Sequence, residues 1–102
     1  MYRARDRLEH SDWLDRLDAA GAELDLSQST RSTAEDLFLT HLPDTERSKP
    51  AVAAASLYAA ALIDGEERSQ PAVAEAMDVS RLSIQTRWKE IMADAGFRPP
   101  TW

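Results

Sequence analysis

Residues 48–64, SKPAVAAASLYAAALID, are the stretch that most restricts how this chain folds. Ser48 is positioned to cap a helix, and Pro50 fits its first turn, where a backbone N–H has no helical partner. The stretch carries no charge from Pro50 until its final Asp64, and a helix that is apolar on all sides is a buried one. Gly65 can then adopt the left-handed conformation that ends helices. The sequence therefore predicts a central, most buried helix on which the other segments pack.

The same stretch is too short to span a membrane. At ~1.5 Å per residue it covers roughly 20 Å, less than the ~30 Å hydrocarbon core of a bilayer. The N-terminal MYRARDRLEH lacks the apolar region of a signal peptide. The chain has no cysteine, which rules out disulfides and zinc–thiolate sites within it and fits a reducing compartment. We therefore expect a cytoplasmic protein without membrane contact.

The charge balance restricts which partners the chain can attract. Its 18 acidic and 12 basic residues give a net charge of −6, and Lys49 and Lys89 are its lysines. An acidic, lysine-poor and alanine-rich composition is typical both of proteins from high-salt habitats and of proteins from GC-rich genomes. A net negative charge repels nucleic acid. Any contact with DNA therefore requires a local basic patch.

Two segments before the central stretch have the three- and four-residue apolar spacing of amphipathic helices. The first covers residues 4–24, with apolar or small residues at Leu8, Trp13, Leu14, Leu17, Ala20, Gly21 and Leu24. The second covers residues 32–42 and begins with Ser32 and Glu35, which have the spacing of a capping box. Its predicted core stripe consists of Ala34, Leu37, Phe38, His41 and Leu42.

Two further helices are predicted after the central stretch, over residues 70–77 and 81–95, each preceded by a serine that can cap it. Gly96 ends the last helix, and a tail follows at residues 96–102. The sequence thus predicts a fold of the all-α class, with five helices in a single domain over residues 1–102. A chain of 102 residues is long enough for one domain with a modest core.

Residues 70–91 have the spacing of a helix-turn-helix. Ala74 is predicted to lie where the two helices cross, because a larger side chain there would push them apart. Asp78 stands at the sharp turn, a position where glycine is commonest because φ can be positive, and aspartate tolerates that region better than most residues. Apolar residues are predicted to fill the pocket between the helices, namely Val73, Met77, Val79 and Ile84. The second helix of such a unit enters the DNA major groove with its N-terminal residues.

The outer face of residues 81–95 follows from placing Ile84, Trp88, Ile91 and Met92 on the inner face. The predicted DNA-facing residues are Arg81, Leu82, Ser83, Gln85, Thr86, Arg87 and Lys89. Gln85 can pair with an adenine edge, and Leu82 can pack on a thymine methyl group. The local net charge from Arg81 to Ile91 is +2. The alternative interpretation is a helix-turn-helix that serves only the packing of the bundle, with a solvated polar face.

The remaining candidate residues favour structural roles. His41 is predicted to be a hydrogen-bonded core histidine, and the acidic run Asp64-Glu66-Glu67 a solvated turn without the spacing of a calcium loop. In the tail, Phe97 and Trp102 are expected to pack on the core, with Trp102 as a partner anchor as the alternative. The sequence has no glycine-rich phosphate loop and no nucleophile motif. We therefore expect no enzyme activity, no cofactor, no metal and no small-molecule substrate.

Residues 48–91 resemble the second cyclin-like repeat of archaeal transcription factor B, the relative of eukaryotic transcription factor IIB. The resemblance rests on S-x-P-A, A-A-A-x-L-Y-x-A-A-L, G-E-x-R-x-Q, V-A-E and S-x-x-S-I-x-x-R-W-K-E-I. Residues 8–42 match more loosely. The resemblance implies a five-helix cyclin fold and a role in transcription initiation. It leaves two possibilities, a domain from a longer protein or a stand-alone single repeat.

In that family the helix-turn-helix of the second repeat reads DNA beside the TATA box, on DNA bent by the TATA-binding protein. The resemblance therefore implies promoter DNA as a partner and the TATA-binding protein as a candidate second partner. Carried over by position, it assigns base reading to Leu82, Ser83 and Gln85. Gln85 stands where the family usually has arginine. Two other functions stay open, a cyclin-like protein-interaction module with little DNA contact and an ordinary dimeric helix-turn-helix regulator.

Overall fold

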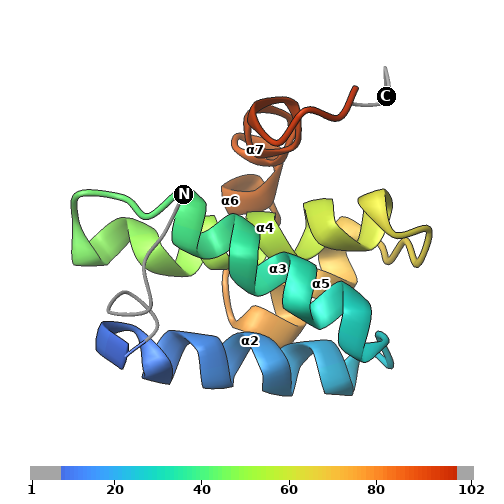
Figure 1. Ribbon diagram of the computed structural model, residues 1–102, viewed down its shortest axis with the longest axis horizontal. Coiled ribbons are helices and arrows are strands. Elements are labelled where there is room, and N and C mark those ends of the chain that lie inside the picture. Colours follow the sequence, from blue (N-terminus) through green and yellow to red (C-terminus); the bar gives the residue numbers. More distant parts are fainter. Residues whose placement is uncertain (1–7, 99–102) are drawn as a thin grey trace.

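The computed structural model describes residues 8–98, and every regular element within that range is a helix. The elements are α2 (Ser11–Glu23), α3 (Gln28–Thr40), a 3-10 helix η1 (Glu46–Ser48), α4 (Lys49–Ile63), α5 (Gln70–Met77), α6 (Arg81–Gln85) and α7 (Trp88–Asp94). The predicted all-α class is confirmed. Figure 1 shows α4 in the middle of the molecule, with α2 on one side and α6 and α7 on the other.

The central position of α4 agrees with the prediction from its composition. Ten of its 15 residues are buried, and Leu57 and Tyr58 are 0% and 2% exposed. The helices α2, α3, α5, α6 and α7 all contact it. Because most of the buried side chains on α4 are alanines, neighbouring helices can approach its backbone closely from several sides. Within residues 8–98, no helix is both long and apolar enough to cross a membrane.

The start of α4 differs from the prediction. Ser48 does not cap the helix through its side chain, because its backbone is already helical, with φ −87° and ψ −11°. Ser48 instead ends the 3-10 helix η1, and its hydroxyl oxygen accepts a hydrogen bond from Thr45 Oγ1 at 3.1 Å. A cap residue needs an extended backbone for its side chain to reach the following N–H groups. Pro50 lies in the first turn of α4, as predicted.

The second predicted helix begins four residues earlier than its capping-box pattern indicated. The cap of α3 is Ser27, whose Oγ accepts the backbone N–H of Thr30 at 3.2 Å, and Thr30 is fully buried. Asp25 has a φ of 60°, and this left-handed residue turns the chain between α2 and α3. The part of the first predicted helix at residues 4–7 lies outside the described residues.

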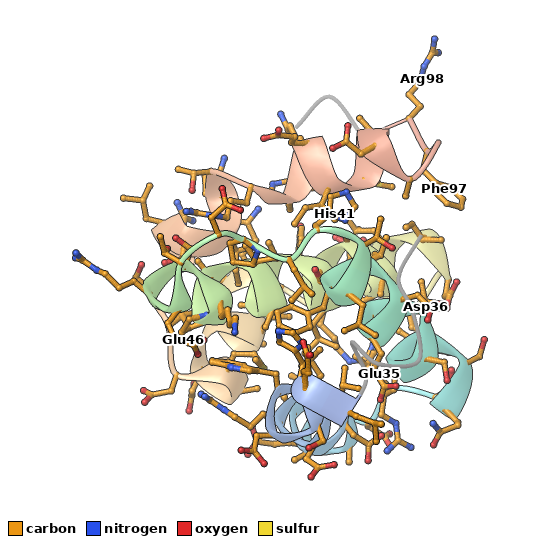
Figure 2. All side chains as sticks on the ribbon, turned by 60° about the vertical axis from the view of Figure 1, so that its left-hand side comes forward. Glu35, Asp36, His41, Glu46, Phe97 and Arg98 are labelled. Atoms are coloured by element: carbon orange, nitrogen blue, oxygen red, sulfur yellow. The ribbon has the colours of Figure 1, made fainter. Side chains whose placement is uncertain are left out.

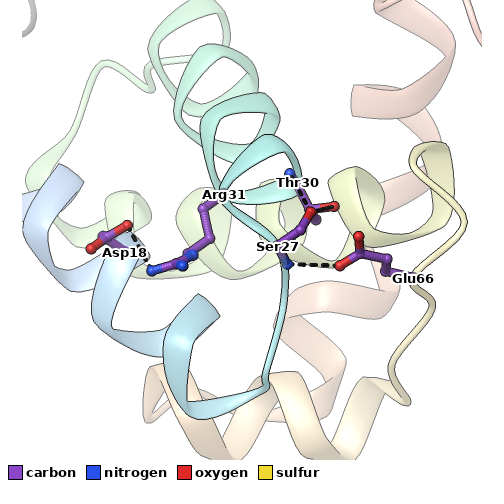
Figure 3. Close-up of polar contacts among 5 residues, drawn as sticks. All are labelled: Asp18, Ser27, Thr30, Arg31 and Glu66. Atoms are coloured by element: carbon purple, nitrogen blue, oxygen red, sulfur yellow. Dashed lines mark hydrogen bonds and ion pairs between the residues drawn. The ribbon is translucent and has the colours of Figure 1, made fainter.

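A close approach between α2 and α3 depends on a glycine. Gly21 of α2 is buried, and a Cβ atom built there would lie 2.4 Å from Arg31 Cγ and 2.7 Å from Arg31 Cδ. The Arg31 side chain therefore crosses α2 directly over this glycine. It reaches Asp18, with 3.3 Å between Nη1 and the carboxylate oxygen (Figure 3). Any larger residue at position 21 would displace the Arg31 side chain and weaken this ion pair.

The charged turn after α4 is solvent-exposed at Asp64 and Glu67, as predicted, but it also contacts the α2–α3 loop, which was not predicted. Glu66 accepts the backbone N–H of Ser27 at 2.8 Å (Figure 3). Arg68 donates from Nε to the Leu24 carbonyl at 2.9 Å and from Nη2 to the Asp25 carbonyl at 3.2 Å. These bonds satisfy polar groups at the end of α2 and the start of α3. The α2–α3 loop is thus fixed against the α4–α5 loop.

The C-terminal segment also departs from the prediction. Phe97 is 45% exposed and does not fold back into the core, and Figure 2 shows it beyond the end of α7 together with Arg98. Gly96 has a φ of 92°, so the chain turns at the predicted position. Trp102 lies outside the described residues.

Removing side-chain volume from the buried centre of α4 tests the architecture. We expect Leu57→Ala to lower the free energy of unfolding by about 2–5 kcal/mol, because the side chain is 0% exposed and the cavity cannot fully collapse. Chemical denaturation would measure the change. Leu82→Ala is the matched control, since Leu82 is 67% exposed and surface changes stay within about 0.5 kcal/mol. Equal losses for the two leucines would contradict a buried α4.

The bond to the Ser27 backbone predicts a specific pH dependence of stability. That hydrogen bond favours the ionised carboxylate and lowers the pKa of Glu66 below its ordinary 4.5. A lowered pKa stabilises the fold at pH values above 4.5 and loses this contribution as the pH falls through the folded-state value. We expect wild-type protein to lose more stability than Glu66→Gln on acidification below pH 4.5. Acid titration followed by circular dichroism would measure it, with Glu67→Gln, at an exposed neighbour, behaving as wild type.

Candidate nucleic-acid interface

The turn between α5 and α6 has the geometry predicted for a helix-turn-helix. Ser69 caps α5 by accepting the Ala72 N–H at 3.2 Å, and Ser80 caps α6 by accepting the Ser83 N–H at 3.3 Å. Asp78 is left-handed, with φ 57° and ψ 48°. The Val79 N–H returns to the Ala74 carbonyl at 2.9 Å, which closes the end of α5 in the manner of a left-handed helix cap.

Buried apolar side chains hold this unit against the central helix. They are Val73, Ala74, Met77, Ile84, Trp88, Ile91 and Met92. The Trp88 and Tyr58 rings meet edge to face, with centroids 5.3 Å apart and an interplanar angle of 79°. Burial raises the pKa of the Tyr58 phenol above its ordinary value. Val79 is half-buried and packs at the edge of the core. The predicted inner face is therefore correct.

The last predicted helix is not continuous, and its single span over residues 81–95 was wrong. α6 ends at Gln85, and α7 begins at Trp88. Thr86 donates its hydroxyl proton to the Leu82 carbonyl at 3.0 Å, and the Arg87 N–H bonds the Ile84 carbonyl at 3.0 Å. The Thr86 hydroxyl competes with backbone N–H groups for the Leu82 carbonyl. The bond from Arg87 to Ile84 spans three residues rather than four, which tightens the turn. The predicted DNA-facing residues consequently lie on α6, on the two-residue turn at Thr86 and Arg87, and on α7.

Exposure separates the predicted DNA-facing residues into two groups. Arg81, Leu82, Gln85, Thr86 and Lys89 are exposed, whereas Ser83 and Arg87 are half-buried. Leu82 projects furthest as an apolar group, with 67% of its surface exposed. Leu82 and Gln85 are three positions apart on α6, so they share one face of the helix. The outer surface of α6 therefore presents an apolar side chain beside an amide and next to Arg81.

The hydroxyl groups of the predicted set are used within the protein. Ser83 Oγ lies 3.1 Å from Ser80 Oγ, and Thr86 Oγ1 accepts a bond from Arg87 Nη1 at 3.3 Å. Lys89 Nζ lies 5.6 Å from the centroid of the Trp88 ring, within the range of a cation–π contact. Among the described residues, no hydrogen bond is found for the Gln85 side chain. The exposed amide of Gln85 therefore remains available on the outer face of α6.

Charge is balanced across the helix-turn-helix. Three cations and three anions lie in residues 70–91, namely Arg81, Arg87 and Lys89 against Glu75, Asp78 and Glu90. The anions Glu75 and Asp78 precede α6. The three cations begin with Arg81, the first residue of α6. The predicted +2 patch is thus a local feature of α6 and the start of α7, beside an acidic α5.

A hollow behind α7 was not predicted. It has a volume of about 150 Å³ and is lined by His41, Val52, Arg87, Glu90, Ile91 and Asp94. Arg87 faces this hollow from the α6–α7 turn, which explains its partial burial. His41 is hydrogen-bonded as predicted, with Nδ1 2.8 Å from the Leu37 carbonyl oxygen, but it lies at the edge of the core. The apolar stripe on residues 32–42 predicted the position of His41. No sequence signal predicted that Asp94 of α7 would lie beside it, with 3.5 Å between Asp94 Oδ2 and His41 Nε2.

The chain matches the family model for the transcription factor TFIIB repeat over residues 9–94. It belongs to the TFIIB repeat family. The fold of such a repeat is cyclin-like, which agrees with the helices around α4. The family model covers α2 through α7, so the match includes the loosely matching N-terminal half as well as the helix-turn-helix.

Several archaeal proteins are similar to this chain. Transcription initiation factor IIB 1 of Thermoplasma volcanium is 39% identical over 77 residues, covering 69% of this chain and 23% of the relative. Transcription initiation factor IIB of Pyrococcus horikoshii is 34% identical over 82 residues, or 76% of this chain and 27% of the relative. Transcription initiation factor IIB 2 of Thermococcus kodakarensis is 30% identical over 87 residues, which cover 82% of this chain and 28% of the relative.

The names of these relatives define a functional class at the level of the family. All three are transcription initiation factors, and such factors are not enzymes. The chain spans about a quarter of the length of these relatives. The TFIIB repeat of this chain therefore corresponds to one portion of a longer type of factor.

Enlarging Ala74 tests how tightly the helix-turn-helix is packed. Ala74 is 5% exposed, and added methylene groups in a packed site cost about 1–3 kcal/mol. We expect Ala74→Leu to loosen α5 and α6 and to leave α2, α3 and α4 largely protected in amide hydrogen exchange. Ala93→Leu, at an exposed position of α7, is the matched control. An unchanged thermal melt and exchange pattern for Ala74→Leu would show that the position has room for a larger side chain.

Proposed function

We propose that this chain is a single cyclin-like domain, residues 1–102, that binds promoter DNA in transcription initiation. It would correspond to the second repeat of transcription factor B, working in the cytoplasm beside the TATA-binding protein. The observation that carries this proposal is the exposed face of α6, where Leu82 is 67% exposed next to Arg81 and Gln85. The serine caps of α5 and α6 and the left-handed turn at Asp78 position that face.

The chemistry of the α6 face favours particular bases. The Gln85 amide can donate to adenine N7 and accept from adenine N6, and Leu82 can pack on a thymine methyl group. Arg81 stands at the first position of α6, where it can reach a phosphate or a guanine edge. Glutamine at position 85, in place of the arginine usual in the family, shifts the preference there from guanine toward adenine.

The length of α6 limits the affinity that this face can supply. A helix of five residues offers little more than one turn to the groove. The charge balance of residues 70–91 adds little attraction to phosphates, because the number of phosphates neutralised sets the electrostatic contribution. We therefore expect the isolated chain to bind DNA weakly. A second DNA-bound protein such as the TATA-binding protein would raise the effective concentration of α6 at its site.

The second candidate function is a cyclin-like protein-interaction module that docks a transcription protein with little DNA contact. The balanced charge of residues 70–91 and the net charge of −6 favour it. This module would use exposed apolar groups such as Leu82 and Phe97 as contacts with protein rather than with bases.

A pair of substitutions separates base reading from phosphate contact. We expect Gln85→Ala to reduce discrimination at one base pair by about 1–3 kcal/mol, and Lys89→Ala to weaken all sequences alike with a shallower salt dependence. Binding of fluorescent promoter DNA at two salt concentrations, with and without TATA-binding protein, would measure both effects. Matched controls are Gln28→Ala, exposed at the start of α3, and Lys49→Ala, whose ammonium pairs with Glu46.

The outcomes distinguish the two functions. If Gln85→Ala loses discrimination between bases while Lys89→Ala and the two control variants keep it, base reading by α6 is supported. If neither substitution alters binding, with or without TATA-binding protein, DNA reading by this chain is excluded. Binding of TATA-binding protein without DNA, weakened by Leu82→Ala, would then favour the interaction module.

A further inference from the structure

His41 joins two parts of the fold that are distant in sequence. It follows the last residue of α3 as its C-cap. Its ring nitrogen Nδ1 lies 2.8 Å from the Leu37 carbonyl oxygen, and its Nε2 lies 3.5 Å from Asp94 Oδ2 at the end of α7. The His41 side chain is 15% exposed and that of Asp94 is 58% exposed. Figure 2 shows His41 facing α7 from the end of α3.

The groups on either side of the ring determine which protonation state fits. A backbone carbonyl and an ionised carboxylate both accept hydrogen bonds and donate none. A neutral imidazole carries one N–H, so it can satisfy the Leu37 carbonyl or the Asp94 carboxylate, but not both. If Nδ1 keeps the proton, the lone pair of Nε2 faces the carboxylate oxygen. The imidazolium ion has two N–H groups and satisfies both partners.

Charged groups of both signs lie around His41. The hollow beside it is lined from α7 by Glu90 and Asp94, from the α6–α7 turn by Arg87, and from α4 by the apolar Val52. A protonated ring at this position would therefore face two anions and one cation.

We propose that protonation of His41 closes a latch between the end of α3 and α7, and that this latch tightens the helix-turn-helix at acidic pH. The protonated ring would hold α7 through Asp94, and α7 follows α6 after the two-residue turn at Thr86 and Arg87. Deprotonation removes the ion pair between His41 Nε2 and Asp94 Oδ2, which lie 3.5 Å apart. The device therefore ties the position of the DNA-facing helix to pH in the range where histidine titrates.

Thermal melting of the protein alone tests the latch. Melting temperatures of wild type and Asp94→Asn are compared at about pH 5.5 and about pH 8, on either side of histidine titration. We expect Asp94→Asn to melt roughly 1–6 °C below wild type at the acidic pH, from the size of a partly exposed ion pair. At the alkaline pH, Asp94→Asn should match or exceed wild type, because a carboxylate near the C-terminus of a helix is unfavourable.

Two further variants make this result specific. In a His41→Gln background, the effect of Asp94→Asn on the melting temperature should no longer depend on pH, because no titrating ring remains at position 41. In a His10→Gln background that pH dependence should persist, since the His10 ring packs edge-on against Phe38 rather than against α7. An Asp94→Asn effect of the same sign and size at both pH values, or a pH-dependent one that survives in His41→Gln, would overturn the latch.

A DNA-binding measurement at both pH values connects the latch to the proposed function, on which this part of the inference rests. We expect wild-type affinity for promoter DNA to fall several-fold between the acidic and alkaline pH, and Asp94→Asn to show a smaller fall. If melting supports the latch but no DNA binds at either pH, the proposed function fails and the latch stands. If DNA binds with equal pH dependence in both proteins while melting supports the latch, the coupling to α6 is overturned.

Discussion

The burial of α4 is the constraint on which the rest of the structure depends. Its alanine-rich surface lets α2, α3, α5, α6 and α7 contact one helix of 15 residues, and a small domain has few other ways to bury enough apolar area. The larger side chains of α4 then determine where its neighbours sit. Tyr58 is one of them, and its edge-to-face contact with Trp88 fixes the start of α7. The position of α6, which ends shortly before Trp88, thus follows from packing in the core.

Polar contacts supply the orientation that alanine packing leaves loosely defined. Small side chains allow close approach but interlock little, so helices on α4 could slide without further restraint. Glu66 and Arg68 tie the α4–α5 loop to the α2–α3 loop through backbone groups of Ser27 and Leu24. The proposed latch between His41 and Asp94 would perform a similar role between α3 and α7, where their side chains lie 3.5 Å apart. Both sets join segments that are distant in sequence.

The sequence predicted the features that depend on local pattern and missed those that depend on neighbours. The apolar run of α4, the capping serines Ser69 and Ser80 and the left-handed Asp78 each have a local cause, and the structure has them where expected. The start of α3 was misplaced because the prediction relied on the Ser32 pattern, whereas Ser27 caps the helix and Thr30 in its first turn is fully buried. The exposed face of α6 followed from periodicity. The break at Thr86 did not, because it depends on one hydroxyl and on turning Trp88 into the core.

The arrangement of charge and shape favours a domain that recognises DNA within a complex. In the proposed function, Leu82 and Gln85 are the groups that would discriminate bases, whereas the balanced charges of residues 70–91 offer little of the nonspecific attraction that brings a protein to DNA. Attraction and discrimination are separable, because phosphate contacts set affinity and groove contacts set sequence preference. A domain with weak attraction to phosphates but with groups suited to base discrimination gains most when another protein places it beside its site. An acidic domain of this kind would spend little time on other DNA, so the base contacts proposed for α6 would matter only where a partner holds the domain.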